Sequence, residues 1–140
     1  MTNVSDVNAM DVFGVIEKPG KEKTLEKYCV CISVGKNSDK YFYINSQHRE
    51  MYDDFGIKAS DYDFLEHDSY IGCSEVQILD KNRFHRKLGT LKHKDMLKIL
   101  NKIRNSECIP EVEKEVLVSE LEDWLENYTK NKLTATFNKR

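Results

Sequence analysis

The sequence lacks the features that mark membrane, exported and nucleotide-dependent proteins. Its apolar runs are too short to span a bilayer, so no membrane helix is predicted. Residues 1–11 are polar, without the charged start and apolar block of a signal peptide, which favours a cytoplasmic protein. There is no P-loop, no G-x-G-x-x-G motif and no cluster of metal-ligating residues, so we expect neither a cofactor nor a metal.

Cysteine is scarce, with four residues in a chain of 140. Cys29 and Cys31 are two residues apart, so a strand would direct both sulfurs to one face. No second pair completes the spacing of a zinc site. In a chain without an export signal, we expect all the thiols to be reduced.

The composition is that of a soluble globular protein, with 39% apolar and 33% charged residues. A length of 140 residues is sufficient for one domain with a core of its own. We place this domain at residues 11–130. A flexible N-terminus at 1–10 and a basic, flexible tail at 131–140 are expected to flank it.

Short apolar runs joined by short polar connections predict an α+β fold, a small barrel of five or six antiparallel strands followed by two helices. In the clearest strand, 28–34, Val30 and Ile32 share one face while Cys29 and Cys31 share the other. The predicted strands are residues 12–16, 28–34, 40–45, 57–58, 69–71 and 76–79.

Two helices are predicted after the strands. The first spans residues 92–104, and the second begins near Pro110, since proline suits the first helical position. The apolar face of the first comprises Met96, Leu97, Leu100 and Ile103. The stripe of the second comprises Val112, Val116, Leu117, Leu121, Trp124, Leu125 and Tyr128.

Charge is strongly segregated although the net charge is only −2. Residues 81–104 hold nine basic side chains against one acid, and residues 107–126 hold eight acids against one lysine. Such blocks say more about partners than about the fold. The basic segment could bind RNA or DNA, or it could be neutralised within the protein by the acidic helix.

The polar cluster after the strand 40–45 is the best candidate site. Ser46, His48 and Arg49 place a hydroxyl, an imidazole and a guanidinium within a few residues. A ribonuclease that uses no metal needs groups that move protons and stabilise the charge that develops on the phosphate. The other interpretation is an ordinary polar surface loop.

Three further motifs have two interpretations each. His67-Asp68-Ser69 resembles a catalytic triad in one line, but strand neighbours face opposite sides, so a structural role for Asp68 at a turn is preferred. His85, Arg86 and Lys87 could contact a phosphate backbone or form a solvated face. Tyr41 and Tyr43 could stack on bases or pack in the core.

The order of these pieces resembles the PemK/MazF family, the toxins of type II toxin–antitoxin modules. The likeness covers roughly residues 12–104 and rests on the order of the segments. These are Phe13-Gly14-Val15, Val30-Cys31-Ile32-Ser33, Ile44-Asn45-Ser46, the run from Ser69 to Ser74, Val76–Leu79, Leu88–Leu91 and the helix that follows.

The resemblance implies an SH3-like barrel that forms a homodimer and cuts single-stranded RNA without a metal. It matches Ser46 to the family's catalytic hydroxyl, while Lys27 stands where the family has an arginine followed by proline. Together with the polar cluster and the basic motif, this gives Ser46, His48 and Lys27 as candidate catalytic residues. The candidate RNA contacts are Arg49, His85, Arg86 and Lys87, and an antitoxin or another protein is the expected partner.

A second hypothesis is a non-catalytic barrel from a mobile element or phage. Because lysine cannot make the forked contact of arginine, Lys27 at the arginine position favours this hypothesis, as does the charge segregation. Such a protein would bind a protein partner or nucleic acid without cutting it.

Overall fold

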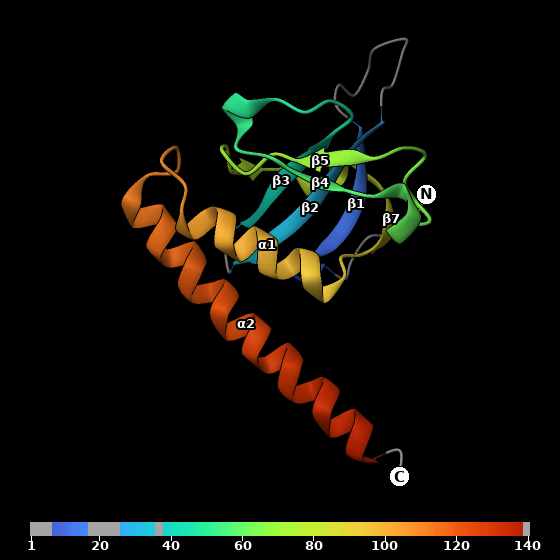
Figure 1. Ribbon diagram of the computed structural model, residues 1–140, viewed down its shortest axis with the longest axis vertical. Helices are drawn as coiled ribbons and strands as arrows, with labels where there is room; N and C mark the ends of the chain where they lie inside the picture. The colour runs from blue at the N-terminus through green and yellow to red at the C-terminus, as the bar shows by residue number, and fades with distance from the viewer. Residues whose placement is uncertain (1–6, 17–25, 36–37, 139–140) are drawn as a thin grey trace.

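The computed structural model describes residues 7–16, 26–35 and 38–138, and it has an α+β fold (Figure 1). The predicted flexible ends therefore lie partly outside the described residues, at 1–6 and 139–140. The strands are β1 (Asp11–Ile16), β2 (Glu26–Val34), β3 (Asp39–Asn45), β4 (Phe55–Ile57), β5 (Ser69–Ile71), β6 (Gln77–Ile78) and β7 (Phe84–Thr90). The helices are α1 (His93–Arg104) and α2 (Glu111–Asn138).

The strands form one antiparallel sheet in the order β4-β5-β3-β2-β1-β7, and β6 pairs with β3 beside this path. The sheet has seven strands rather than the five or six predicted. Within the described part of the chain, β4 and β7 end the path and do not pair with each other. The predicted SH3-like closed barrel is therefore not confirmed.

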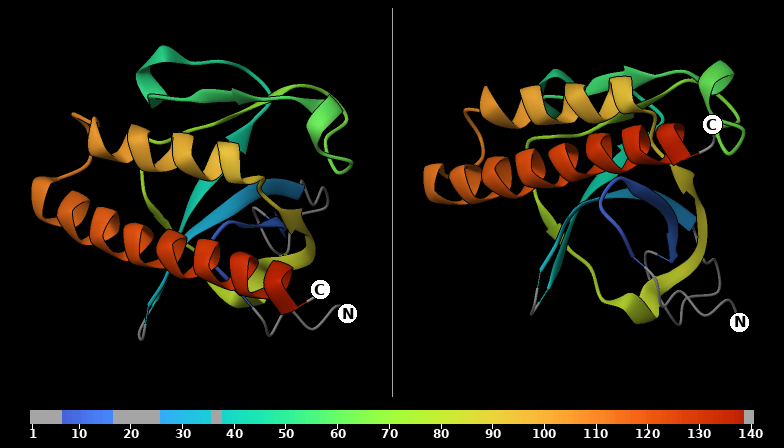
Figure 2. Two further views of the ribbon diagram at one scale, coloured as in Figure 1. Left: turned by 60° about the horizontal axis from the view of Figure 1, so that its bottom comes forward. Right: turned by 90° about the horizontal axis from the view of Figure 1, so that it is seen from below.

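The central strands divide their side chains between two cores. Val30 and Ile32 belong to a large core that also contains buried residues of α1 and α2. Cys29 and Cys31 belong to a smaller core on the opposite face, as the alternation of the sequence predicts. Both helices lie on the same side of the sheet (Figure 2), so the face with the cysteines is left without a helix.

The helix α1 begins and ends close to the predicted bounds, but its buried face differs at one position. Met96, Ile99, Leu100 and Ile103 are buried, whereas Leu97 is 47% exposed. A spacing of three and four residues keeps the buried set on one stripe, and Leu97 lies about 100° away from Met96. The prediction that Leu97 belongs to this face is wrong.

The helix α2 packs through Leu117, Leu121 and Leu125, which are spaced four residues apart and buried. Val112 and Val116 are 77% and 42% exposed, so the prediction that they belong to this stripe is wrong. The helix continues to Asn138, through most of the segment predicted as a flexible tail. No glycine or proline interrupts this segment, so nothing in it breaks the helix.

The strand β7 is the element that the sequence did not predict. It pairs with β1 in the second core, where the ring of Phe84 stacks on Phe13 at 4.9 Å between centroids. His85, Arg86 and Lys87 therefore lie on an edge strand and not at a junction between sheet and helix. None of the described helices is long and apolar enough to cross a membrane.

Candidate functional site

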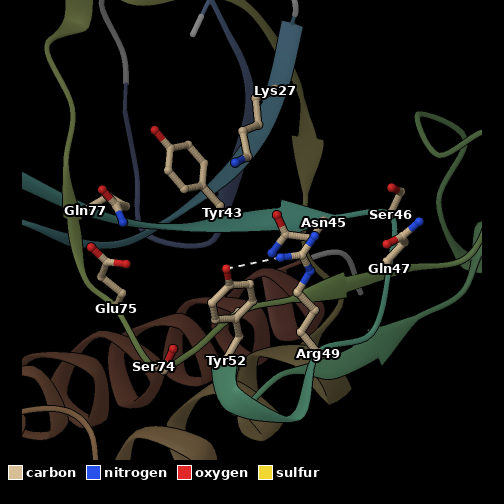
Figure 3. Close-up of a pocket in the computed structure, with 11 residues that line it drawn as sticks. Lys27, Tyr43, Asn45, Ser46, Gln47, Arg49, Tyr52, Ser74, Glu75 and Gln77 are labelled. Atoms are coloured by element: carbon tan, nitrogen blue, oxygen red, sulfur yellow. Dashed lines mark hydrogen bonds between the residues drawn. The ribbon is translucent and has the colours of Figure 1, made fainter.

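A pocket of about 530 Å³ opens at the end of β3, on the face of the sheet opposite the helices (Figure 3). Three parts of the chain form it: the central strands, the loop after Asn45, and the segment around β6. Its lining comprises Lys27, Tyr43, Asn45, Ser46, Gln47, Arg49, Tyr52, Gly72, Ser74, Glu75 and Gln77.

The strand register places Lys27 and Tyr43 together. Tyr43 lies opposite Cys29, which is two residues from Lys27 and therefore on the same face of β2. The ammonium group of Lys27 lies 4.2 Å from the centroid of the Tyr43 ring, which is a cation–π contact. Asn45 follows Tyr43 by two residues, so the strand presents both side chains to the pocket.

The buried carboxylate of Asp54 holds the loop after Ser46. Its Oδ2 accepts a hydrogen bond of 2.8 Å from the backbone N–H of Arg49, and its Oδ1 pairs with Nδ1 of His48. The Asp54 side chain is fully buried, while the His48 side chain is 54% exposed. Asp54 therefore anchors both residues to one internal group.

The same loop is joined to the segment that leads to β6. The carbonyl of Tyr52 accepts hydrogen bonds of 3.0 Å from the backbone N–H groups of Cys73 and Ser74. The backbone N–H of Gly72 donates to the carbonyl of Tyr43 at the same distance. These three bonds place Glu75 opposite the loop across the pocket.

Arg49 lies against the wall of the pocket. Its Nη1 donates a hydrogen bond of 3.4 Å to the hydroxyl of Tyr52, and its guanidinium carbon is 5.5 Å from the centre of that ring. No carboxylate pairs with Arg49 in the part of the chain that the structure describes. Its remaining donors can therefore contact an anion.

The structure brings together Lys27, Ser46 and Arg49 among the residues singled out from the sequence. His48 does not belong to the lining. Its ring lies 5.5 Å from that of Tyr70, whose strand partner is Asn45, so His48 borders the site. Apart from Asp54, His48 has no hydrogen-bond partner among residues 7–16, 26–35 and 38–138.

The cluster of His85, Arg86 and Lys87 lies outside the pocket, and both of its strong cations are paired. Arg86 donates two hydrogen bonds to Glu26, of 2.9 and 2.7 Å, and this carboxylate raises the pKa of the guanidinium. Lys87 lies 3.1 Å from Asp11. Neither cation is available to a ligand without loss of its partner.

Gly14 allows the bond between Glu26 and Arg86 to cross β1. Gly14 lies opposite Arg86 on β7 and Tyr28 on β2, and the side chain of Glu26, two residues before Tyr28, reaches over the glycine. A Cβ at this position would stand 2.3 Å from Oε2 of Glu26, which is too close for any side chain to be tolerated without movement.

The rest of the basic segment is also neutralised within the protein. Lys94 bonds to Asp61 at 2.6 Å and holds the pKa of that carboxyl below its ordinary value. Lys102 lies 3.4 Å from Asp53. In the described chain only Arg104 pairs with the acidic helix, through Glu122. The sequence left open a neutralisation by the acidic helix, but most of these cations pair with carboxylates elsewhere, on β1, β2, α1 and the segment from Asp53 to Asp61.

The remaining motifs have structural roles in part. Asp68 accepts a hydrogen bond of 2.9 Å from the backbone N–H of Ala59, nine residues earlier, so its role is structural as predicted but joins two segments and not a local turn. Tyr41 is buried in the second core, whereas Tyr43 is partly exposed in the pocket. Ser69 lines a second pocket of about 370 Å³ that shares Lys27 and Ser46 with the first.

The sequence did not single out Glu75, Gln77 or Tyr52 as site residues. Asn45 could have been found, because it ends a strand next to Ser46. No pattern in the local sequence marks Glu75 and Gln77 as site residues, since their position depends on the pairing of β6 with β3. No group of three or more His, Cys, Asp or Glu side chains in the described ranges is placed to hold a metal ion.

Two solved structures with this fold are similar to the chain. The Mycobacterium tuberculosis toxin MazF-mt6 has a TM-score of 0.53 and 13% identity, over 68% of this chain and 92% of that one. An endoribonuclease in complex with its cognate antitoxin, from a Mycobacterial species, has a TM-score of 0.53 and 16% identity, over 73% and 95%. A search of curated proteins found no match.

The family comparison covers more than half of the sequence. Residues 19–106 match the family described as the PemK-like, MazF-like toxin of type II toxin–antitoxin systems. The matched region contains Lys27, Ser46 and Arg49 and ends before α2 begins. The chain therefore belongs to the PemK/MazF-like toxin family.

Proposed function

We propose that this protein is an endoribonuclease toxin that cuts single-stranded RNA without a metal, in the cytoplasm. The observation that carries the proposal is the pocket in which Lys27, Ser46 and Arg49 meet. Membership of a toxin family and a fold shared with an endoribonuclease support the same conclusion.

The chemistry requires a base, an acid and cationic groups near one phosphate. The base removes the proton of the 2′-hydroxyl, and the 2′ oxygen attacks phosphorus. The bond from phosphorus to the 5′ oxygen breaks, and the acid protonates that oxygen. The products are a 2′,3′-cyclic phosphate and a 5′-hydroxyl.

The residues of the site are assigned to these roles by their chemistry. Lys27 and Arg49 stabilise the negative charge that grows on the phosphate oxygens, and Ser46 donates a hydrogen bond to one of them. His48 serves as base and then as acid: it accepts the proton of the 2′-hydroxyl and returns that proton to the departing 5′ oxygen, because imidazole can both accept and donate a proton. His85, Arg86 and Lys87 stay predictions as contacts to RNA farther along the strand.

The test incubates the purified protein with long single-stranded RNA in the presence of EDTA. We expect cleavage that leaves cyclic phosphate ends, with a loss of about 10²-fold or more in rate for Lys27→Met and for Ser46→Ala. Lys130→Met is the matched control, because Lys130 lies on α2 and pairs with Glu126. Intact RNA at high protein concentration would contradict the proposal.

The second hypothesis, a binding protein without activity, is favoured by Lys27 at the position of the family's arginine. The same experiment separates the two. RNA that is bound in a salt-sensitive manner and not cut supports the binding protein. If RNA is neither bound nor cut, a protein is the only ligand that remains for this second hypothesis.

A protein partner is expected because one similar structure is an endoribonuclease with its cognate antitoxin. We propose that an antitoxin binds this chain and that the chain forms a homodimer. Light scattering of the purified protein checks the dimer, and a molecular mass of one chain would contradict it.

A further inference from the structure

We propose, on the basis of the proposed function, that the pocket selects guanine next to the phosphate that is cut, through Glu75 and Gln77. The inference goes beyond the family match, because it rests on side chains that the match does not assign. It starts from the uneven distribution of charge within the pocket.

The pocket has a cationic end and an end that carries a carboxylate and an amide. In the view of Figure 3, the rings of Tyr43 and Tyr52 lie between Arg49 on one side and Glu75 and Gln77 on the other. A phosphate fits at the cationic end, and a base could stack on the tyrosine rings. The edge of that base would then face Glu75 and Gln77.

Glu75 has an exposed carboxylate, and no residue of the described chain forms a hydrogen bond or an ion pair with it. The backbone around it is nevertheless held in place. Ser74 donates to the carbonyl of Tyr52, and Gln77 lies opposite Tyr41 in the pairing of β6 with β3. An unpaired acceptor on an ordered segment at the wall of a pocket is suited to bind a donor on a ligand.

The Watson–Crick edge of guanine supplies the matching donors. An ionised carboxylate only accepts hydrogen bonds, and its two oxygens suit two adjacent N–H groups. Guanine presents such a pair at N1 and N2, beside the acceptor O6, to which the amide of Gln77 can donate. Bases of single-stranded RNA are read on this edge when they are splayed out.

The other bases place an acceptor where the carboxylate needs a donor. Adenine and cytosine each offer one amine beside a bare ring nitrogen, and uracil offers one N–H between two carbonyls. Each of them would bring a lone pair against a Glu75 oxygen. We therefore expect guanine to be preferred by roughly tenfold or more, as for other good paired contacts to a base.

The experiment uses the full chain and short RNA strands with a single variable position. Where long RNA is cut, this position is placed at the mapped cleavage site; where it is not cut, the position lies in an otherwise uniform strand. A 2′-deoxy substitution at the cut nucleotide blocks cleavage, so binding is measured by fluorescence anisotropy apart from catalysis. Guanine is compared with inosine, which lacks the N2 amine, and with adenine, cytosine and uracil. We expect guanine to bind most tightly and inosine to be intermediate.

The variant Glu75→Gln tests the group itself. Glutamine offers one acceptor and one donor, so the variant should lose the preference for guanine and gain relative affinity for adenine. Because Glu75 is exposed, the fold should not change. Glu115→Gln is the control, since Glu115 is exposed on α2 and lines neither this pocket nor the second pocket beside it.

The outcomes separate this inference from the proposed function. Cleavage with no preference for guanine, or a preference that Glu75→Gln leaves intact, overturns the inference while the ribonuclease stands. A preference for guanine in the binding measurement with 2′-deoxy strands supports the inference even if long RNA is not cleaved. Strands that are neither bound nor cut overturn both.

Discussion

At the scale of single residues, Asp54 connects the candidate chemistry to the core. Its carboxylate is fully buried, which is costly for a charge unless partners satisfy it. Its two oxygens hold His48 and the backbone of Arg49, the residues proposed for proton transfer and for charge stabilisation. Asp54, which does not line the pocket, thus positions Arg49, which lines it, and His48, which borders it.

Replacing Asp54 by Asn should lower kcat and leave KM nearly unchanged. Asparagine keeps an acceptor for the Arg49 backbone but no longer offers a charged oxygen to the His48 ring. Loss of general acid–base catalysis costs about 10²–10⁴-fold, and we expect His48→Ala to fall in this range and Asp54→Asn below it. Steady-state kinetics on a short RNA substrate provide the measurement.

A double-mutant cycle distinguishes positioning from a general structural role. Residues that act through one another show strongly non-additive effects. In the His48→Ala background, Asp54→Asn should therefore cause little further loss of kcat. Equal losses in both backgrounds would show that Asp54 acts on the fold and not through His48.

The residues of the site that could be predicted from the sequence are those near one strand end. Ser46 and Arg49 lie in a short local cluster, and Lys27 was identified by family likeness, so each is found without knowledge of the sheet. Glu75 and Gln77 reach the pocket only through pairing with β3 and the hydrogen bonds to Tyr52. Such long-range contacts leave no periodic signal in a single sequence.

At the scale of elements, the apolar strands and both helices followed from periodicity, and β7 did not. Between Phe84 and Leu88 this strand carries only His85, Arg86 and Lys87, so its alternation is weak. The strand is held by its edge position beside β1 and by the stacking of Phe84 on Phe13. Its cations are tolerated because they pair with carboxylates of neighbouring strands.

The helix α2 begins beyond the matched family region, yet it contributes to the main core. Leu121 is fully buried against α1 and the sheet, so Leu121→Ala should lower the free energy of unfolding by about 2–5 kcal/mol. Val112→Ala is the control, because Val112 is 77% exposed and should cost under about 0.5 kcal/mol. Urea denaturation followed by circular dichroism measures both.

Equal, small effects of the two variants would mean that α2 does not stabilise the domain. In that case the family region would be stable by itself, and α2 would be an appendage. The packing favours the opposite result, since Leu117, Leu121 and Leu125 all belong to the same core as α1.

At the scale of the whole molecule, electrostatics decide how RNA is held. The basic segment has many cations, but those of β7 and α1 are largely paired with carboxylates. The pocket adds Lys27 and Arg49 at the place where a phosphate is proposed to bind. Affinity should therefore depend on few phosphate contacts despite the large number of lysines and arginines.

The salt dependence of RNA binding tests this view of the molecule. Each phosphate that is neutralised on a single strand contributes about −0.7 to the slope of log K against log salt. Two contacts, from Lys27 and Arg49, predict a slope of about −1.4, whereas all nine cations of the basic segment would give roughly −6.

Glu26→Gln removes the partner of Arg86 and should steepen the slope by about 0.7 where RNA reaches β7. Glu126→Gln, which releases Lys130 on α2, is the matched control and should leave the slope unchanged. A steep slope in the unaltered protein would mean that RNA displaces the internal ion pairs, and the basic segment would then be the main binding surface.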